Sequence, residues 1–519
     1  MEFFSAKNGD KTCTVNGKSL HSKYNPSLEG EKFAESLPAD FSPFCVIIIE
    51  PALSYCAKNL RKRFPDAKIC CIRFLDDFKD SDSVWDFVFY GANENFRNLS
   101  ADLYNALGEE ILMSTLVFDW QPSKNIFPEE NFKCWQEIKK SILKARDVLG
   151  TRSYFSKRWL KNSVQFCKKI ESGFVFDFSN CGKSGFQKQV LVAASGPSLE
   201  NSLSFIKKYR ENFFLIAVSS ALFPLVSSGI EPDLTISTDG GFWAKRHLSL
   251  ISDSKKNSGR AFGIEAEGAC FSEIFEKNEI VPLCYDDGLE KELLQAINCP
   301  FLLTKRNGTV AGTALESAFS FTNGKIFLAG FDQAPAKGFQ HTQPNALEII
   351  SQKSDFRLSP KETRLTKSRF GSKETLEIYR NWFVSNSKKF SARVFRISDD
   401  YGFPFSLGEI KDISWKDFEK FSEKSDKNSN ENCNGNKAEN KQNQIPKTYF
   451  KIQIPKSERK EKIISKLREL SDSEFFISEV FPLDFLLLKR ELNEEKKLEL
   501  KKNLKEKIEN LIKEIEEKI

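Results

Sequence analysis

The segment from 166 to 400 alternates short apolar strands with helical stretches, and this alternation limits the fold more than any other feature. The strand candidates are Val190–Ala194, Phe214–Val218, Leu234–Ser237, Ala261–Ile264, Ile280–Cys284, Lys325–Ala329 and Val394–Ile397. Helices fill the gaps, most clearly at Leu199–Tyr209 and Ala311–Phe321. Strands that alternate with helices form parallel sheets covered on both faces. The pattern therefore predicts a central α/β domain with a doubly wound, Rossmann-like sheet.

A smaller α/β domain is predicted over residues 1–165. Cys45–Ile49 and Ile69–Ile72 have the apolar character of buried strands, and the basic stretch Lys58–Phe64 between them is helical. The turn after the first strand begins with Glu50 and Pro51 and contains no glycine, which prevents a phosphate from approaching its backbone closely. We therefore expect a degenerate Rossmann-like module that serves the structure or holds an acceptor.

A C-terminal helical region is predicted over residues 401–519. Residues 422–444 have almost no aliphatic side chain, so we expect a disordered linker there. Residues 492–519 form a highly charged helix with one apolar stripe, which consists of Leu500, Leu504, Ile508, Leu511 and Ile515. The stripe packs on the body of the protein or on a second copy. The first alternative is favoured because fewer than four clean heptads are present.

Composition excludes several classes of protein. The 78 basic and 72 acidic residues nearly cancel, so the chain is not a dedicated nucleic-acid binder. The 12 cysteines form no C-x-x-C pair and only three histidines exist, so no metal site is expected. The N-terminus does not resemble a signal peptide, and no apolar run approaches the roughly 20 residues of a membrane span. We expect a cytoplasmic protein without a membrane span.

The strongest candidate for a binding site is the turn Ser195-Gly196-Pro197-Ser198, between a strand and a helix. Small residues allow a ligand to approach the backbone, proline starts a helix, and the free N–H groups of a helix N-terminus suit a phosphate. An ordinary tight turn of an α/β protein is the alternative. The turn is neither a P-loop nor G-x-G-x-x-G, so neither motif supports ATP or NAD binding here.

Other strand ends of this domain are also polar, and the carboxyl ends of parallel strands meet at one edge. The candidates there are Ser219, Asp239, Gly308, Thr309, Asp332 and His341. Asp239 suits a ribose hydroxyl or a base edge, or it caps the turn at Gly240. His341 suits proton transfer near neutral pH, although a surface histidine without a role is the alternative. We expect a structural role for His247.

The chain resembles the motility accessory factor family. The resemblance rests on ASGPSL at 194–199, SSALFPLVSSGIEPDLTISTD at 219–239, GTVAGTALESA at 308–318 and KIFLAGFDQ at 325–333 followed by His341. It implies a flagellin glycosyltransferase that moves a nonulosonic acid from a CMP-sugar to Ser or Thr. The central domain is similar to bacterial sialyltransferases of GT-A-like fold.

The resemblance also implies roles for single residues. The bend 195–198, Ser219, Asp239, Gly308 and Thr309 surround the nucleotide. Asp332 and His341 are the catalytic residues at the reacting centre, where His341 or Asp332 is the base for the acceptor hydroxyl. No cofactor or divalent metal is required. The chain departs from the pattern at Gln333-Ala334 and Thr342, and it has no histidine before 372–383, where sialyltransferases carry one.

Two other functions stay open. Archaeal 6-hydroxymethyl-dihydropterin diphosphokinases share the G-P-S-L and P-D…D motifs and use ATP with magnesium, but they are compact and have a single domain. A flagellin-binding scaffold without catalytic activity would retain the fold but not the chemistry.

Overall fold

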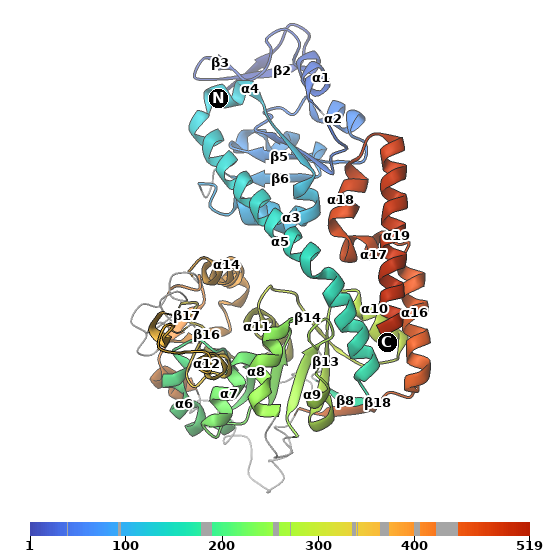
Figure 1. Ribbon diagram of the computed structural model, residues 1–519. Coiled ribbons are helices and arrows are strands. Elements are labelled where there is room, and N and C mark those ends of the chain that lie inside the picture. Colours follow the sequence, from blue (N-terminus) through green and yellow to red (C-terminus); the bar gives the residue numbers. More distant parts are fainter. Residues whose placement is uncertain are drawn as a thin grey trace, which may run out of the picture. The chain divides into compact units, whose positions relative to one another are not determined.

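The computed structural model describes residues 1–38, 40–91, 95–177, 189–252, 259–269, 271–334, 339, 341–363, 373–398, 405–421 and 445–518 (Figure 1). Contacts divide the chain into two compact units, residues 1–157 with 470–511 and residues 158–469 with 512–519. These units differ from the three predicted regions, because the residues after 401 are shared between them. The predicted linker 422–444 lies outside the described residues.

The first unit contains a four-stranded parallel sheet in the order β6-β5-β4-β7. Its strands are β4 (Cys45–Ile49), β5 (Lys68–Arg73), β6 (Phe87–Tyr90) and β7 (Thr115–Asp119). The predicted strand–helix–strand unit is confirmed, because α2 (Ala57–Arg63) connects β4 to β5 and these strands are parallel. A three-stranded antiparallel sheet precedes it, made of β1 (Glu2–Ser5), β2 (Lys11–Val15) and β3 (Lys18–Ser19).

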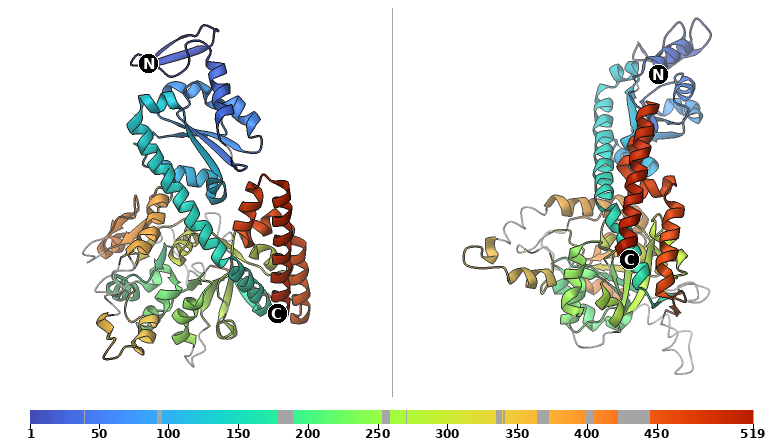
Figure 2. Two further views of the ribbon diagram at one scale, coloured as in Figure 1. Left: turned by 45° about the horizontal axis from the view of Figure 1, so that its top comes forward. Right: turned by 45° about the vertical axis from the view of Figure 1, so that its right-hand side comes forward.

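Strand β4 is buried on both faces, which explains its continuous apolar sequence. Alternate side chains face opposite ways, so Ile47 packs with α3 (Leu99–Met113) and α5 (Pro128–Lys169). Ile48 packs on the other face with α1 (Pro26–Ser36) and α2. Figure 2 shows the strands between these two layers of helices.

The turn after β4 has a strained backbone and a buried charge. Glu50, Ala52 and Ser54 have φ values of 44°, 44° and 63°, a region that residues other than glycine rarely adopt. The buried Glu50 carboxylate accepts hydrogen bonds from the backbone N–H groups of Phe74 and Leu75. Arg73 lies 3.2 Å from the same carboxylate. The Glu50 carboxylate after β4 therefore binds the backbone N–H groups that follow the neighbouring strand β5.

The second unit contains a nine-stranded sheet in the order β14-β13-β12-β11-β10-β9-β15-β16-β17. All neighbouring strands are parallel, which confirms the predicted doubly wound α/β fold. All seven predicted strands are present within one or two residues, and two more lie at the edges. The strands are β9 (Gln189–Ala193), β10 (Phe213–Val218), β11 (Leu234–Ser237), β12 (Ala261–Glu265), β13 (Glu279–Tyr285), β14 (Leu302–Thr304), β15 (Ile326–Ala329), β16 (Val394–Ile397) and β17 (Lys411–Ile413).

The core of this unit lies on β9, β10 and β15, where every side chain but those of Gln189 and Phe214 is almost inaccessible to solvent. Helices α6 (Leu199–Lys208), α7 (Ser219–Ser227), α11 (Val310–Phe321) and α14 (Lys373–Phe390) contribute to it. The other helices are α8 (Phe242–Ser252), α9 (Ser272–Lys277), α10 (Glu290–Ala296) and α12 (Ala346–Gln352). A two-stranded antiparallel sheet joins β8 (Ser172–Phe176) to β18 (Lys447–Lys451).

The C-terminal segment is helical, as predicted. Its helices are α16 (Lys456–Leu470), α17 (Glu474–Val480), α18 (Pro482–Arg490) and α19 (Glu494–Lys518). In α19, Leu504, Ile508, Leu511 and Ile515 are buried, so most of the apolar stripe packs within this chain. None of the described helices combines the length and the apolar character that crossing a membrane requires.

We expect Arg73→Met to lower the free energy of unfolding by about 3 kcal/mol, because it leaves the buried Glu50 carboxylate without its ion pair. Adding Glu50→Gln to this variant should restore part of the loss. Urea unfolding followed by circular dichroism measures both effects. The control is Arg61→Met, whose ion pair with Asp86 is half-exposed and should contribute less than about 1 kcal/mol. Equal losses in the two arginine variants would contradict this account.

Candidate functional site

The order of strands reverses between β9 and β15 in the nine-stranded sheet. From β9 the chain adds β10 to β14 on one side, and from β15 it adds β16 and β17 on the other. Ligands of open α/β sheets bind at the carboxyl ends of the strands, at such a reversal. The loops that leave this point contain residues 194–198 and 330–334, which include five of the residues predicted from sequence.

Two glycines let these loops cross in close contact. The N–H group of Gly196 donates to the carbonyl oxygen of Gly330 over 2.8 Å. A Cβ atom on Gly196 would lie 2.4 Å from that oxygen, and one on Gly330 would lie 2.2 Å from the carbonyl oxygen of Ala194. Gly330 also has a φ of +72°, which glycine adopts without strain. Gly196 and Gly330 are therefore needed so that the two loops can cross. The sequence had instead suggested that small residues here allow a ligand to approach closely.

Asp332 holds the bend from the opposite loop. The backbone N–H group of Ser198 donates to Asp332 Oδ2 over 2.6 Å, and the Ser198 hydroxyl donates to the other carboxylate oxygen. Both residues are buried. The first free N–H group at the start of α6 thus meets a carboxylate of the chain, which stabilises the positive end of the helix.

The loop that carries His341 is attached to the same bend. The N–H group of Thr342 donates to the carbonyl oxygen of Ser195 over 2.8 Å. The hydroxyl groups of Ser195 and Ser220 lie 2.7 Å apart, and Ser219 is buried at the start of α7. The structure therefore brings Ser195, Ser219, Asp332 and the His341 loop together, as predicted from the strand ends.

A second histidine, His247, lies beside His341, although its sequence context had predicted a structural role. The rings of His247, on α8, and His341 have centroids 5.7 Å apart. Burial lowers the pKa of both, and the neighbouring His341 helps to lower the pKa of His247 to about 3. Both imidazoles are therefore neutral near pH 7. The only sequence signal for this pair is that the chain contains just three histidines.

The remaining predicted residues shape turns at the same edge. Asp239 Oδ1 accepts a hydrogen bond from the N–H group of Gly241 over 2.8 Å, so the carboxylate caps this turn. Thr309 caps α11 in the same way, because its hydroxyl accepts from the N–H group of Gly312 over 2.9 Å. Gly308 precedes it with a φ of +69°. Burial and the charge of Asp239 raise the pKa of Tyr379 on α14.

A buried acidic cluster occupies the ends of β12 and β13 and was not recognised in the sequence. Its glutamates are Glu265, Glu267 and Glu290. Burial raises the pKa of each, and that of Glu267 to about 8. Arg306 lies 3.0 Å from Glu267 and contacts the faces of Trp159 and Tyr285, with cation–ring distances of 5.0 and 4.8 Å. A carboxylate that ends the apolar strand Ala261–Ile264 was the available signal.

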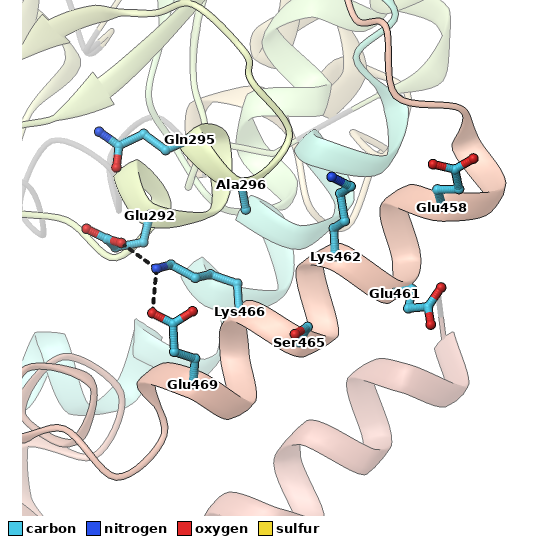
Figure 3. A pocket seen from close by; sticks show the side chains of 9 residues that line it. All are labelled: Glu292, Gln295, Ala296, Glu458, Glu461, Lys462, Ser465, Lys466 and Glu469. Carbon is cyan, nitrogen blue, oxygen red and sulfur yellow. Dashed lines mark hydrogen bonds and ion pairs between the residues drawn. The ribbon is translucent and has the colours of Figure 1, made fainter.

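A separate groove of about 660 Å³ lies between α10 and α16 of this unit. Figure 3 shows Lys466 between two carboxylates, 3.1 Å from Glu292 and 2.9 Å from Glu469. None of the residues predicted from sequence lines it. Among the described residues, no three His, Cys, Asp or Glu side chains are grouped so that they could hold a metal ion.

Comparisons with known proteins give one family domain and two kinds of relative. Residues 157–338 match the protein-family model described as 6-hydroxymethylpterin diphosphokinase MptE-like. An uncharacterized protein of Treponema pallidum (strain Nichols) is 30% identical over 330 residues, which is 63% of this chain and 69% of that protein. Another uncharacterized protein of this organism is 24% identical over 119 residues, 23% of this chain and 55% of that protein.

One similar solved structure is that of the MAf glycosyltransferase from Magnetospirillum magneticum AMB-1. It has a TM-score of 0.54 and 13% sequence identity, and the match covers 99% of this chain and 91% of that one. At this identity the likeness establishes the fold. It extends over the whole chain, beyond the residues that the family domain matches.

We expect the stability of the chain to fall between pH 5 and 8 through its buried glutamates. A carboxyl group with a raised pKa binds its proton more tightly in the folded state, so its contribution is lost as pH rises. Glu265→Gln keeps the shape of the side chain and removes one titratable carboxyl group. As pH rises, the variant should therefore gain stability relative to the native chain. The difference in their free energies of unfolding should change by at most about 1.4 kcal/mol per pH unit.

Chemical denaturation at pH 5, 6, 7 and 8 measures this difference. Glu273→Gln, on the exposed surface of α9, is the matched control and should give a difference that does not change with pH. A constant difference for Glu265→Gln would show that its carboxyl group has an ordinary pKa in the folded chain.

Proposed function

We propose that the chain is a glycosyltransferase of the motility accessory factor family, because residues 157–338 match the MptE-like family model and the fold resembles that of a MAf glycosyltransferase. The observation that carries the proposal is the contact of the 194–198 and 330–334 loops where the strand order reverses. This is where a doubly wound sheet binds its ligands. The fold shared with a MAf glycosyltransferase over the whole chain supports it.

We further propose that the donor is a CMP-activated nonulosonic acid and that the acceptor is a Ser or Thr hydroxyl of flagellin. The motifs at 194–199, 219–239, 308–318 and 325–333 support this choice of substrates. The nucleotide binds along the bend, with Asp239, Gly308 and Thr309 beside it. The reaction takes place in the cytoplasm and requires no divalent metal.

In this reaction the acceptor oxygen forms a bond to the anomeric carbon as the bond from that carbon to the CMP phosphate breaks. His341 takes the proton of the hydroxyl, since partial burial lowers its pKa and keeps the imidazole neutral at physiological pH. CMP leaves with the bonding electrons, and the N-terminal end of α11, which follows Gly308 and Thr309, stabilises its charge. Asp332 is a positioning residue, because its carboxylate holds Ser198.

A diphosphokinase is the second candidate, and the description of the matched family domain favours it. Such an enzyme would bind ATP with magnesium in place of CMP. Calorimetry on the full chain with CMP, and with ATP plus magnesium, separates the two candidates. Binding of ATP without binding of CMP would support the diphosphokinase, and binding of neither would support a scaffold.

The decisive experiment incubates the full chain with a CMP-nonulosonate and unmodified flagellin. We expect release of CMP and an intact flagellin mass increased by the sugar. His341→Gln should slow CMP release by at least about a hundredfold, the usual contribution of a general base. Flagellin of unchanged mass in a strain that lacks this chain would contradict the assignment.

The rate should also depend on pH in a defined direction. Burial lowers the pKa of His341, so the imidazole is still neutral at pH 6.5, the ordinary pKa of histidine. We therefore expect the rate to remain constant down to pH 6.5 and to fall only at lower pH, as His341 takes up a proton. A pH–rate profile of CMP release measures this limb, and a fall that begins above pH 7 would exclude His341 as the base.

A further inference from the structure

Two large aromatic side chains lie exposed at the start of α8, directly after the Asp239 turn. Phe242 and Trp243 are 59% and 60% accessible to solvent, and their rings meet edge to face with centroids 5.6 Å apart. Exposing two adjacent aromatic rings costs free energy, and such surfaces mark binding sites. Their place at the carboxyl end of β11 puts them on the edge of the sheet that carries the candidate site.

Helix α8 leads from this aromatic pair toward the histidines. Trp243 and His247 are four residues apart and therefore lie on one face of the helix. The ring of His247 meets that of His341, whose neighbour Thr342 is bonded to the bend at Ser195. The exposed indole thus belongs to the same helix face as the residues that border the proposed reacting centre.

Positive charge accompanies the aromatic rings. The guanidinium of Arg246 lies 4.6 Å from the centroid of the Phe242 ring, and Lys245 is exposed on the same turn. Phe242 and Arg246 are also four residues apart, so their contact follows from the helix. An arginine beside an aromatic face suits a ligand with both an apolar face and a carboxylate.

We propose that Phe242, Trp243 and Arg246 form the subsite for the sugar ring and the carboxylate of the donor proposed above. The proposal rests on the proposed glycosyltransferase function. The C–H face of the ring packs on the indole, and Arg246 binds the carboxylate. Two other ligands fit less well. A cytosine base would stack on the rings but would not need the cations. A protein partner would need a much larger surface than two side chains provide.

Calorimetry on the full chain tests this subsite with two probes, CMP and CMP-N-acetylneuraminic acid. We expect the native chain to bind the sugar nucleotide more tightly than CMP. Trp243→Ala should weaken binding of the sugar nucleotide about tenfold and change binding of CMP less than twofold. Phe132→Ala removes an equally exposed aromatic ring, 64% accessible, from the first unit and should change neither.

A second variant tests the carboxylate. Arg246→Gln should weaken binding of CMP-N-acetylneuraminic acid at least fivefold and leave binding of CMP unchanged. Equal loss for both probes in Trp243→Ala would assign the indole to the base and overturn the proposal. Unchanged affinity in both variants would overturn it too, and would leave the surface to the acceptor polypeptide. Failure of the native chain to bind CMP would instead contradict the proposed function.

Discussion

The carboxylate of Asp332 connects the two halves of the large sheet at the point where its strand order reverses. It accepts the backbone and side-chain hydrogen bonds of Ser198, and Gly196 and Gly330 provide the space for this contact. The loop of His341 is then attached through Thr342 and Ser195. This contact between the two loops therefore places the bend directly, and it places the loop of His341 through one neighbour.

In the first unit a different acidic residue binds backbone N–H groups beyond a strand end. Glu50 follows the central strand β4 and accepts the N–H groups of Phe74 and Leu75, while Arg73 neutralises its charge. In both sheets a carboxylate of the chain binds backbone N–H groups that a ligand phosphate can use elsewhere. The difference lies in the surroundings. Glu50 is enclosed by a strained turn, whereas the bend that Asp332 holds is bonded to the loop of His341, whose ring meets that of His247.

Much of the fold could be predicted from the sequence because buried parallel strands are apolar along their whole length. β9 and β10 are of this kind, and both were found within one or two residues. Ser195 and Asp332, which follow different strands, lie in loops that meet, because parallel strands share one carboxyl edge. What could not be predicted depends on side-chain contacts between distant segments. The Ser198–Asp332 bond and the pairing of His247 with His341 join residues 134 and 94 positions apart in the sequence.

The shared C-terminal segment has a consequence for synthesis of the chain. The first unit is made of residues 1–157 and 470–511, and Arg152 pairs with Glu479 over 2.6 Å inside it. Ser156 likewise donates to the carbonyl oxygen of Val480 over 2.8 Å. Domains generally fold as units while the ribosome is still at work, with N-terminal parts first. Here the first unit cannot complete its folding until residues 470–511 are synthesised, more than three hundred codons after residue 157.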